Sequence, residues 1–203
     1  MRKVLLTGFE PFGGNLINPS ALAAQALAGR IISGRRVESL VLPCVFGKSL
    51  VRLREQIRRI QPELVICTGL AGGRSDISLE RIAINIADAS IPDNAGNQPV
   101  DCPVVPTGPA AYWSTLPIKA IVAKLTAAEL PVSISPSAGT FVCNHLFYGL
   151  MRTLKRKPNM RGGFIHLPFL PEQTRRVAGG SKGLPLPKIV RGLEIAIATS
   201  LAH

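Results

Sequence analysis

Two kinds of side chain in this sequence could together perform acyl transfer, a cysteine thiol and a histidine imidazole. The four cysteines are Cys44, Cys67, Cys102 and Cys143. None belongs to a C-x-x-C pair and no histidine lies at zinc-ligand spacing from two of them, so we expect no metal site. Cys67 lies inside an apolar run and is expected in the core. Cys143 follows a small-residue turn at 137–140 and begins a helical pattern, so its thiol falls in or near a first helical turn.

A thiol in that position has two interpretations. The partial positive charge at a helix N-terminus favours the thiolate, and nearby backbone N–H groups can hold an oxyanion. The alternative is a structural cysteine, buried and inert. The pattern makes Cys143 the strongest candidate nucleophile of the four without deciding between the two.

The three histidines can be compared by elimination. His203 is the last residue of the sequence and is expected to be frayed. His145 follows Cys143 by two positions in the same predicted helix, so the two side chains point to different faces. His166 ends a predicted strand, where catalytic residues of α/β proteins tend to lie. If a Cys–His pair exists, His166 is the partner of Cys143; a core or surface histidine is the alternative.

Glu80 is the unusual carboxylate of the chain. Residues 78–86 have the alternation of one strand, which puts Glu80 on the same face as the isoleucines that follow it. A carboxylate on an apolar face needs a strong partner. Either Glu80 orients His166 as the third member of a triad, or it forms a buried ion pair with an arginine.

Two loops are rich in glycine. Gly8–Gly14 follows the first predicted strand and carries Phe9 and Phe12, and Gly69–Gly73 follows a buried strand. Neither has the spacing of a dinucleotide or P-loop motif, so no nucleotide cofactor is expected. Two phenylalanines in an exposed loop indicate a flat apolar ligand approached closely by backbone, whereas tight turns are the plainer interpretation.

These groups must be positioned by alternating strands and helices. The patterns predict strands at 3–7, 37–42, 63–68, 132–135 and 164–167, and helices at 50–60, 118–125, 141–154 and 189–201, with another beginning at Pro19 and capped by Asn18. This order predicts one α/β domain over residues 1–203, with a mostly parallel twisted sheet and helices on both faces. Ligands should then bind in the loops beyond Thr7, Thr68, Ser135 and His166. Val177–Pro187 is expected to be a surface loop.

Composition limits the classes of protein. The chain has 203 residues, 46% hydrophobic content and a net charge of +12. We expect a globular, cytoplasmic protein, since no stretch has the length of a signal core or a membrane span. The basic residues fall in small groups along the whole chain, with few Trp or Tyr residues near them for stacking, so we expect no nucleic-acid partner.

Five blocks of sequence together resemble the pyroglutamyl peptidase I (pyrrolidone carboxyl peptidase) family of cysteine peptidases. In chain order they are Thr7–Gly14 with Asn18–Ser20, Ala71–Arg74 with Glu80–Asn85, Ile91–Pro99, Gly139–His145 and Gly162–Pro168.

The resemblance implies an open α/β/α sandwich that hydrolyses the amide bond after an N-terminal pyroglutamyl residue of peptides, through a thioester and without a cofactor. It implies a Glu80–Cys143–His166 triad. It implies homo-oligomers, a dimer or tetramer. It also implies a pocket for the pyroglutamyl ring lined by Phe9, Phe12, Cys44, Ile91, Phe141 and Val142, with Asn18 and the backbone around Leu70 at the polar atoms of the lactam.

Some positions depart from the family's pattern. Ser90 stands where an arginine near the oxyanion site is frequent, and Leu70 stands where many members have glutamine. The backbone N–H of Cys143 is one candidate oxyanion donor. Because Ser90 lacks a positive charge, Arg74 is the basic side chain that we expect to take the role of the frequent arginine. A thiol amidase for another small acyl group, or a basic binding protein on a hydrolase scaffold, are the rival functions.

Overall fold

Seven strands form one mixed, mostly parallel sheet in the computed structural model, which describes residues 2–174 and 183–203. Their order in the sheet is β2-β3-β1-β4-β9-β5-β8. The strands are β1 (Lys3–Phe9), β2 (Ile31–Ile32), β3 (Arg35–Leu42), β4 (Leu64–Leu70), β5 (Ile77–Glu80), β8 (Val132–Ser135) and β9 (Arg161–Leu167). In the sheet order, the neighbouring strands β3, β1, β4 and β9 are parallel to one another. Strand β5 is antiparallel to β9, and β8 is parallel to β5. The predicted mostly parallel sheet is confirmed.

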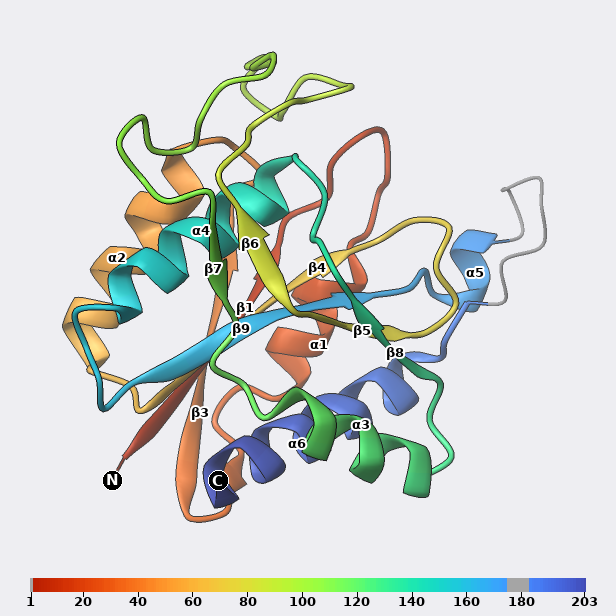
Figure 1. Cartoon of the computed structure of the whole chain (residues 1–203). Helices are drawn as coiled ribbons and strands as arrows, with labels where there is room; N and C mark the ends of the chain where they lie inside the picture. Colours follow the sequence, from red (N-terminus) through yellow and green to blue (C-terminus); the bar gives the residue numbers. More distant parts are fainter. Residues whose placement is uncertain (1, 175–182) are drawn as a thin grey trace.

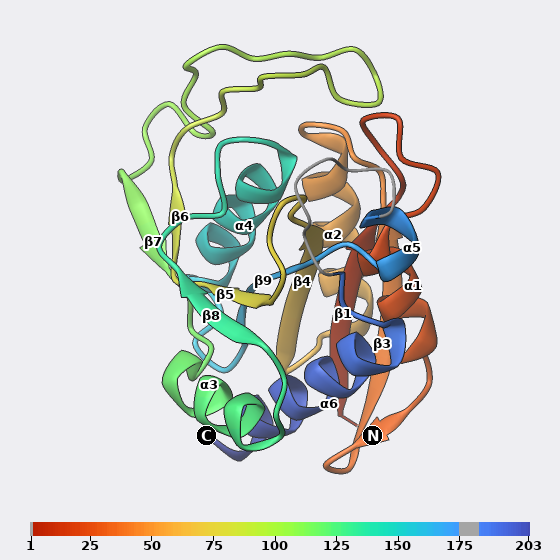
Figure 2. The ribbon, with the colours of Figure 1, turned by 90° about the vertical axis from the view of Figure 1, so that its right-hand side faces the viewer.

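Helices cover both faces of this sheet. On one face lie α1 (Pro19–Ala26), α3 (Ile118–Ala127) and α6 (Leu186–Ala202), and on the other lie α2 (Lys48–Ile60) and α4 (Val142–Leu154) (Figures 1 and 2). A short helix, α5 (Pro171–Thr174), follows β9. The predicted α/β/α sandwich is therefore confirmed. Among the described helices, none has the length and apolar character needed to cross a bilayer.

The core follows from the alternation of side chains along the central strands. Every residue of β4 is buried, as its uninterrupted apolar sequence predicts. Leu64 and Ile66 pack into the cluster under α1, α3 and α6, whereas Val65 and Cys67 pack into the cluster under α2 and α4. The sheet thus separates two apolar layers, and the second layer surrounds Cys143.

The stretch 78–86 is not one strand, and the predicted alternation beyond Glu80 is wrong. β5 ends at Glu80, and β6 (Ile82–Ile84) pairs with β7 (Ala111–Trp113) in a separate two-stranded sheet. The chain leaves the main sheet and enters the small sheet at Arg81. The Arg81 N–H donates to the Ser135 carbonyl, and the Arg81 carbonyl accepts from the Ser114 N–H, both at 2.9 Å. Of the isoleucines expected beside Glu80, Ile86 is 39% exposed.

The loop after β1 begins later than expected. Gly8 and Phe9 belong to β1, and Phe9 is buried rather than exposed. Gly8 is required because a β-carbon there would lie 2.2 Å from the carbonyl oxygen of Ser20, so the start of α1 packs directly on the strand. The N–H of Phe9 also donates to Ser20 Oγ at 2.9 Å. The carboxyl end of β1 is thereby fixed to the first turn of α1.

The predicted surface loop at Val177–Pro187 falls partly outside the described residues, which omit 175–182. At its end, Leu186 and Pro187 begin α6 and are not loop residues. Leu184 is buried against the layer of α1, α3 and α6. The apolar side chain of Leu184 therefore anchors the chain before the last helix.

Candidate active site

Glu80 and His166 meet on the face of the sheet that α2 and α4 cover. β5 and β9 are antiparallel, with Glu80 opposite Phe164 and Ser78 opposite His166, so Glu80 is a diagonal neighbour of His166. Glu80 Oε1 accepts a hydrogen bond from His166 Nδ1 at 2.7 Å. Glu80 is fully buried and His166 is 5% exposed. A bond at Nδ1 leaves Nε2 as the ring nitrogen that can exchange a proton with a nucleophile.

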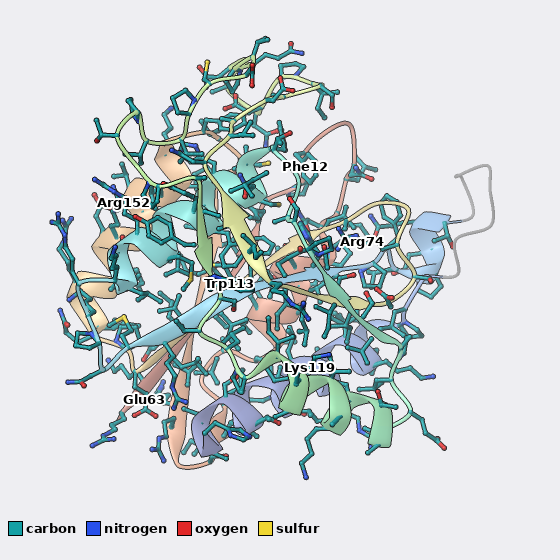
Figure 3. The ribbon with its side chains drawn as sticks, in the orientation of Figure 1. Phe12, Glu63, Arg74, Trp113, Lys119 and Arg152 are labelled. Carbon is teal, nitrogen blue, oxygen red and sulfur yellow. The ribbon has the colours of Figure 1, made fainter. Side chains whose placement is uncertain are left out.

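The second partner of Glu80 is Arg74, which follows β4 (Figure 3). Arg74 Nη1 donates to the same Oε1 atom at 2.7 Å, and Nη2 donates to Ser135 Oγ at 3.3 Å. Within the described residues, Glu80 Oε2 has no hydrogen-bond partner. The sequence left open whether Glu80 pairs with a histidine or with an arginine, and the structure contains both contacts.

Cys143 is the second residue of α4 and its side chain lies over Gly69 of β4. A β-carbon on Gly69 would lie 2.8 Å from Cys143 Sγ. Gly69 pairs in parallel register with His166, so the two residues face the same side of the sheet on adjacent strands. No described side chain caps the first turn of α4, whose N-cap residue is Phe141. The thiol, the imidazole and uncapped helical N–H groups therefore come together in one place.

The environment of Cys143 does not favour the thiolate that its helix position predicts. Burial raises the pKa of the Cys143 thiol well above its usual value, Cys44, Glu80 and Cys67 raise it further, and Arg74 opposes them. Burial also raises the pKa values of Cys44 and Cys67 to about 12. This environment favours the neutral thiol, which needs a base at the moment of attack.

His145 faces away from this site, as its helical spacing predicts. Its Nε2 accepts a hydrogen bond from the N–H of Gly47 at 3.3 Å, and its ring packs edge-on against Phe46 at 5.5 Å. Burial and the nearby charge of Arg54 lower the pKa of His145. It is a neutral histidine packed against the start of α2.

Asn144 is an important residue that the sequence reasoning missed. This fully buried side chain accepts from the N–H of Ile84 at 3.0 Å and donates to the carbonyls of Ile84 and Ile86 at 2.9 Å each. It therefore attaches the first turn of α4 to β6. The available signal was an amide inside the apolar sequence of a buried helix, next to the candidate nucleophile.

An aromatic group lies at the mouth of the predicted substrate pocket. The rings of Phe12 and Phe141 are 5.9 Å apart, and Phe46 packs edge-on against Phe141 at 5.4 Å. Ile91 lies beside the same loop, since a β-carbon on Gly13, the residue after Phe12, would lie 3.5 Å from its Cδ1 atom. Phe46 was not predicted, although an aromatic residue two positions before a helix and two positions after Cys44 was a usable signal.

The other predicted pocket residues lie deeper. Phe9, Cys44 and Val142 belong to the same apolar cluster as Cys143. Leu70 ends β4 opposite Leu167, and none of the four is more than 6% exposed. In the described part of the chain, no three His, Cys, Asp or Glu side chains are grouped to hold a metal ion.

Asn18 is occupied as the cap of α1. Its Oδ1 accepts from the Ser20 N–H at 3.1 Å and from Ser20 Oγ at 2.8 Å, and its Nδ2 donates to the Glu10 carbonyl at 3.1 Å. The predicted N-cap is confirmed. Both acceptor positions of the amide oxygen are used inside the protein, so its predicted role at the lactam stays a prediction.

Polar contacts of Glu10 and Asp93 hold the loops of the pocket together. Glu10 Oε1 accepts from the Cys44 N–H at 3.0 Å and from Asn94 Nδ2 at 2.9 Å. Asp93 Oδ2 accepts from the Phe46 N–H at 2.9 Å. The loops after β1 and β3 are therefore tied to the segment that carries Ile91.

The segment before Ile91 is tied to the turn that precedes Cys143. The Asp88 N–H donates to the Thr140 carbonyl at 3.0 Å, and Thr140 Oγ1 donates to the Asp88 carbonyl at 2.6 Å. Ser90 is exposed and lies two residues further along. Its position therefore belongs to the rim of the same site.

Comparisons with known proteins agree on one family. The family model described as pyroglutamyl peptidase matches residues 2–203. A pyrrolidone-carboxylate peptidase of Bacillus thuringiensis (strain Al Hakam) is 56% identical over 198 residues, covering 97% of this chain and 92% of that protein. The crystal structure of Bacillus amyloliquefaciens pyroglutamyl peptidase I superposes with a TM-score of 0.95 at 50% identity, covering 100% of this chain and 98% of the other. The pyrrolidone carboxyl peptidase of Thermococcus litoralis superposes with a TM-score of 0.96 at 38% identity, covering 100% and 94%.

Proposed function

The chain belongs to the pyroglutamyl peptidase family, and we propose that Cys143, His166 and Glu80 are the residues with which it acts. It is a cysteine peptidase that removes an N-terminal pyroglutamyl residue. The observation that supports this assignment most is the 2.7 Å contact between His166 Nδ1 and the fully buried Glu80, on the same sheet face as the Cys143 thiol.

In the proposed mechanism, His166 acts as base and then as acid. Its Nε2 takes the proton of the Cys143 thiol as the sulfur attacks the pyroglutamyl carbonyl, because the buried thiol does not ionise beforehand. The tetrahedral intermediate collapses to a thioester when His166 returns that proton to the leaving amine. A water, deprotonated by His166, then attacks the thioester, and the departing thiolate regains its proton.

Glu80 supports both steps by orienting the imidazole and stabilising its protonated form. Arg74 shares the carboxylate oxygen that His166 contacts. Charge-assisted bonds of this kind fix the position of a carboxylate. Arg74 is therefore a positioning residue for Glu80, and its further role as an oxyanion donor is tested below.

The backbone N–H of Cys143 is the proposed oxyanion donor. Within the described chain no side chain caps this turn of α4, so its first N–H groups keep their donor capacity. The partial positive charge of the helix N-terminus adds to the stabilisation of a developing oxyanion.

The pyroglutamyl ring is proposed to bind beside Phe12, Phe141 and Ile91. A planar lactam has no free α-amine, and the aromatic rings at this position offer flat apolar contact. Phe9, Cys44 and Val142 form the floor of the pocket, and the backbone near Leu70 and the amide of Asn18 are the groups assigned to the lactam's polar atoms.

We also infer that residues 1–203 form one domain and that the protein assembles as a homodimer or homotetramer in the cytoplasm. The seven-stranded sheet includes both β1, the first strand of the chain, and β9, the last, which supports one domain. The assembly is inferred from the family resemblance. Light scattering coupled to size exclusion measures it, and a monomer at micromolar concentration would contradict it.

Release of a fluorogenic amine tests the function. We expect turnover of a pyroglutamyl amide and little turnover of the matching prolyl amide, because proline lacks the lactam carbonyl. Equal turnover of the two would indicate a general thiol amidase. No turnover of either by folded protein would favour a binding protein on the same scaffold.

A further inference from the structure

Basic residues that are far apart in the sequence come together on α2 and α4. These helices lie side by side on one face of the sheet (Figures 1 and 2). Across 48–60 and 142–160 the basic residues are Lys48, Arg52, Arg54, Arg58, Arg59, Arg152, Lys155, Arg156 and Lys157. Glu55 is the acidic residue in these two ranges. Much of the chain's excess positive charge is therefore concentrated on one side of the molecule.

Part of this surface is hollowed. Arg54, Arg152, Arg156 and Lys157, together with Thr153, line a surface hollow of about 510 Å³. Arg54 Nε donates to Thr153 Oγ1 at 3.3 Å, which holds the guanidinium of α2 against the end of α4. We call these five residues the basic hollow.

Among the residues that the structure describes, no acidic side chain forms an ion pair with the basic hollow. The ion pairs between described residues use Arg2, Lys3, Arg30, Arg35, Arg36, Arg74 and His166, all outside the hollow. Burial, followed by the charges of Arg152 and Arg58, lowers the pKa of Arg54. These like charges repel one another, and an anion placed among them would remove that repulsion.

Helix ends explain only some of these residues. Arg152 lies in the last turn of α4, where a cation complements the helix dipole. Arg54 lies in the middle of α2, so the helix dipole does not account for it. The clustering of four cations around one hollow needs another reason.

We propose that the basic hollow is a binding site for a small anion that carries a phosphate group. Guanidinium groups match phosphate oxygens in paired hydrogen bonds, and several can share one multiply charged group. No aromatic side chain lines the hollow in the described structure, so it lacks the stacking surfaces with which proteins bind single-stranded nucleic acid. Its volume lies in the range of small-ligand sites, about 300–1,000 Å³.

This site is separate from the catalytic one. Cys143 is at the start of α4 and Arg152 is nine residues later, a separation of about 14 Å along the helix axis. Figure 3 shows Arg152 on the opposite side of the view from Arg74, the partner of Glu80. Ligand binding in the hollow is therefore measurable without reference to peptidase activity.

Calorimetric titration of the full chain with inorganic phosphate and with tripolyphosphate, at constant ionic strength, tests the proposal. We expect saturable binding of at least one of the two probes. In Arg54→Gln/Arg152→Gln the Kd should rise about tenfold or more, because two charged partners of the phosphate are lost. The matched control Lys119→Gln/Lys124→Gln removes two exposed charges from α3 and should change the Kd less than about twofold.

The two probes also distinguish the source of the phosphate. Binding of inorganic phosphate supports a site for the free ion, and binding of tripolyphosphate alone supports a phosphate group of a larger ligand. If the first double variant fails to fold, Arg156→Gln/Lys157→Gln on the turn after α4 provides the same comparison.

Three results would overturn the proposal. They are no saturable binding of either probe, equal losses in the hollow and control variants, and binding of a single-stranded oligonucleotide without binding of either phosphate probe. Equal losses would show that net charge alone attracts the anion, and the third result would assign the surface to a polymer backbone.

Discussion

Gly69 gives Cys143 the space that its sulfur occupies. A β-carbon on Gly69 would lie 2.8 Å from Sγ and 3.0 Å from Cζ of Phe164. Gly69→Ala should therefore displace the thiol and reduce kcat/KM by about 10- to 100-fold, since small misplacements of reacting groups are costly. The control is Gly163→Ala, whose β-carbon would meet Ser114 and Leu116 instead. Both variants should lower Tm to a similar extent. Only Gly69→Ala should change the rate at which iodoacetamide alkylates Cys143. Equal effects of the two variants on that alkylation rate would refute this account.

Cys143→Ala should abolish turnover and leave the fold intact, because an alanine side chain has no group that can attack the carbonyl. Cys67→Ala is the control, since Cys67 is fully buried in β4. It should lower the free energy of unfolding by about 1–2 kcal/mol through a small cavity and keep most activity. Assays of both variants beside urea unfolding check this. Ordinary activity in Cys143→Ala would exclude the mechanism.

The reactivity of Cys143 toward iodoacetamide should depend on pH in a particular direction. Because burial raises the pKa of this thiol above its usual value of 9.0, the thiolate is scarce at neutral pH. The alkylation rate of the free enzyme should rise about tenfold per pH unit up to at least pH 9. Subtracting the rate of Cys143→Ala removes the exposed Cys102 from the signal. A plateau near neutral pH would instead indicate a preformed thiolate–imidazolium pair.

Glu80→Gln should reduce kcat by tens- to thousands-fold, on the order expected when an amide orients an imidazole but cannot stabilise its charge. The loss should be smaller than for Cys143→Ala. Glu63→Gln is a suitable control, because its carboxylate pairs with Arg2 and Arg35 and lies outside the site. A fall in Tm without a specific effect on kcat would show that Glu80 acts only as the structural ion-pair partner of Arg74.

Ser90→Arg tests how the oxyanion is stabilised in a chain that lacks the frequent arginine. A charged donor at this point usually contributes a few kcal/mol, about 3–4 in the strongest cases. We expect Ser90→Arg to raise kcat, or to leave it unchanged if Arg74 already serves. Arg74→Ala should then cost more in the Ser90 parent than in the Ser90→Arg variant. The kcat/KM values of the parent, the two single variants and the double variant form a double-mutant cycle. Strictly additive effects would show that residues 74 and 90 do not stabilise the same oxyanion.

The regular elements of the fold were predictable because they depend on local patterns. The apolar run at Leu64 gave β4, and the spacing of Leu50, Leu53 and Ile57 gave the buried face of α2. The cap formed by Asn18 was equally local.

The errors arise where distant segments decide the outcome. Arg81 leaves the main sheet because Ser135 and Ser114 bind its backbone from two different elements, and no alternation within 78–86 reports that. Phe9 packs into the apolar layer under α2 and α4, on the sheet face opposite α1, so its burial depends on later segments of the chain. The contacts of Asn144 reach Ile84, sixty residues earlier in the chain.

The position of β9 determines when the main sheet becomes complete during synthesis. β9 is the last strand in the chain, yet it lies between β4 and β5. Both of those strands are made earlier and keep an unpaired edge until residues 161–167 arrive, and unpaired edges of apolar strands can join other chains. The strand that closes this gap also brings His166. With His166 as the base, a growing chain cannot cleave peptides before its sheet is closed, so folding and activation of the peptidase are one event.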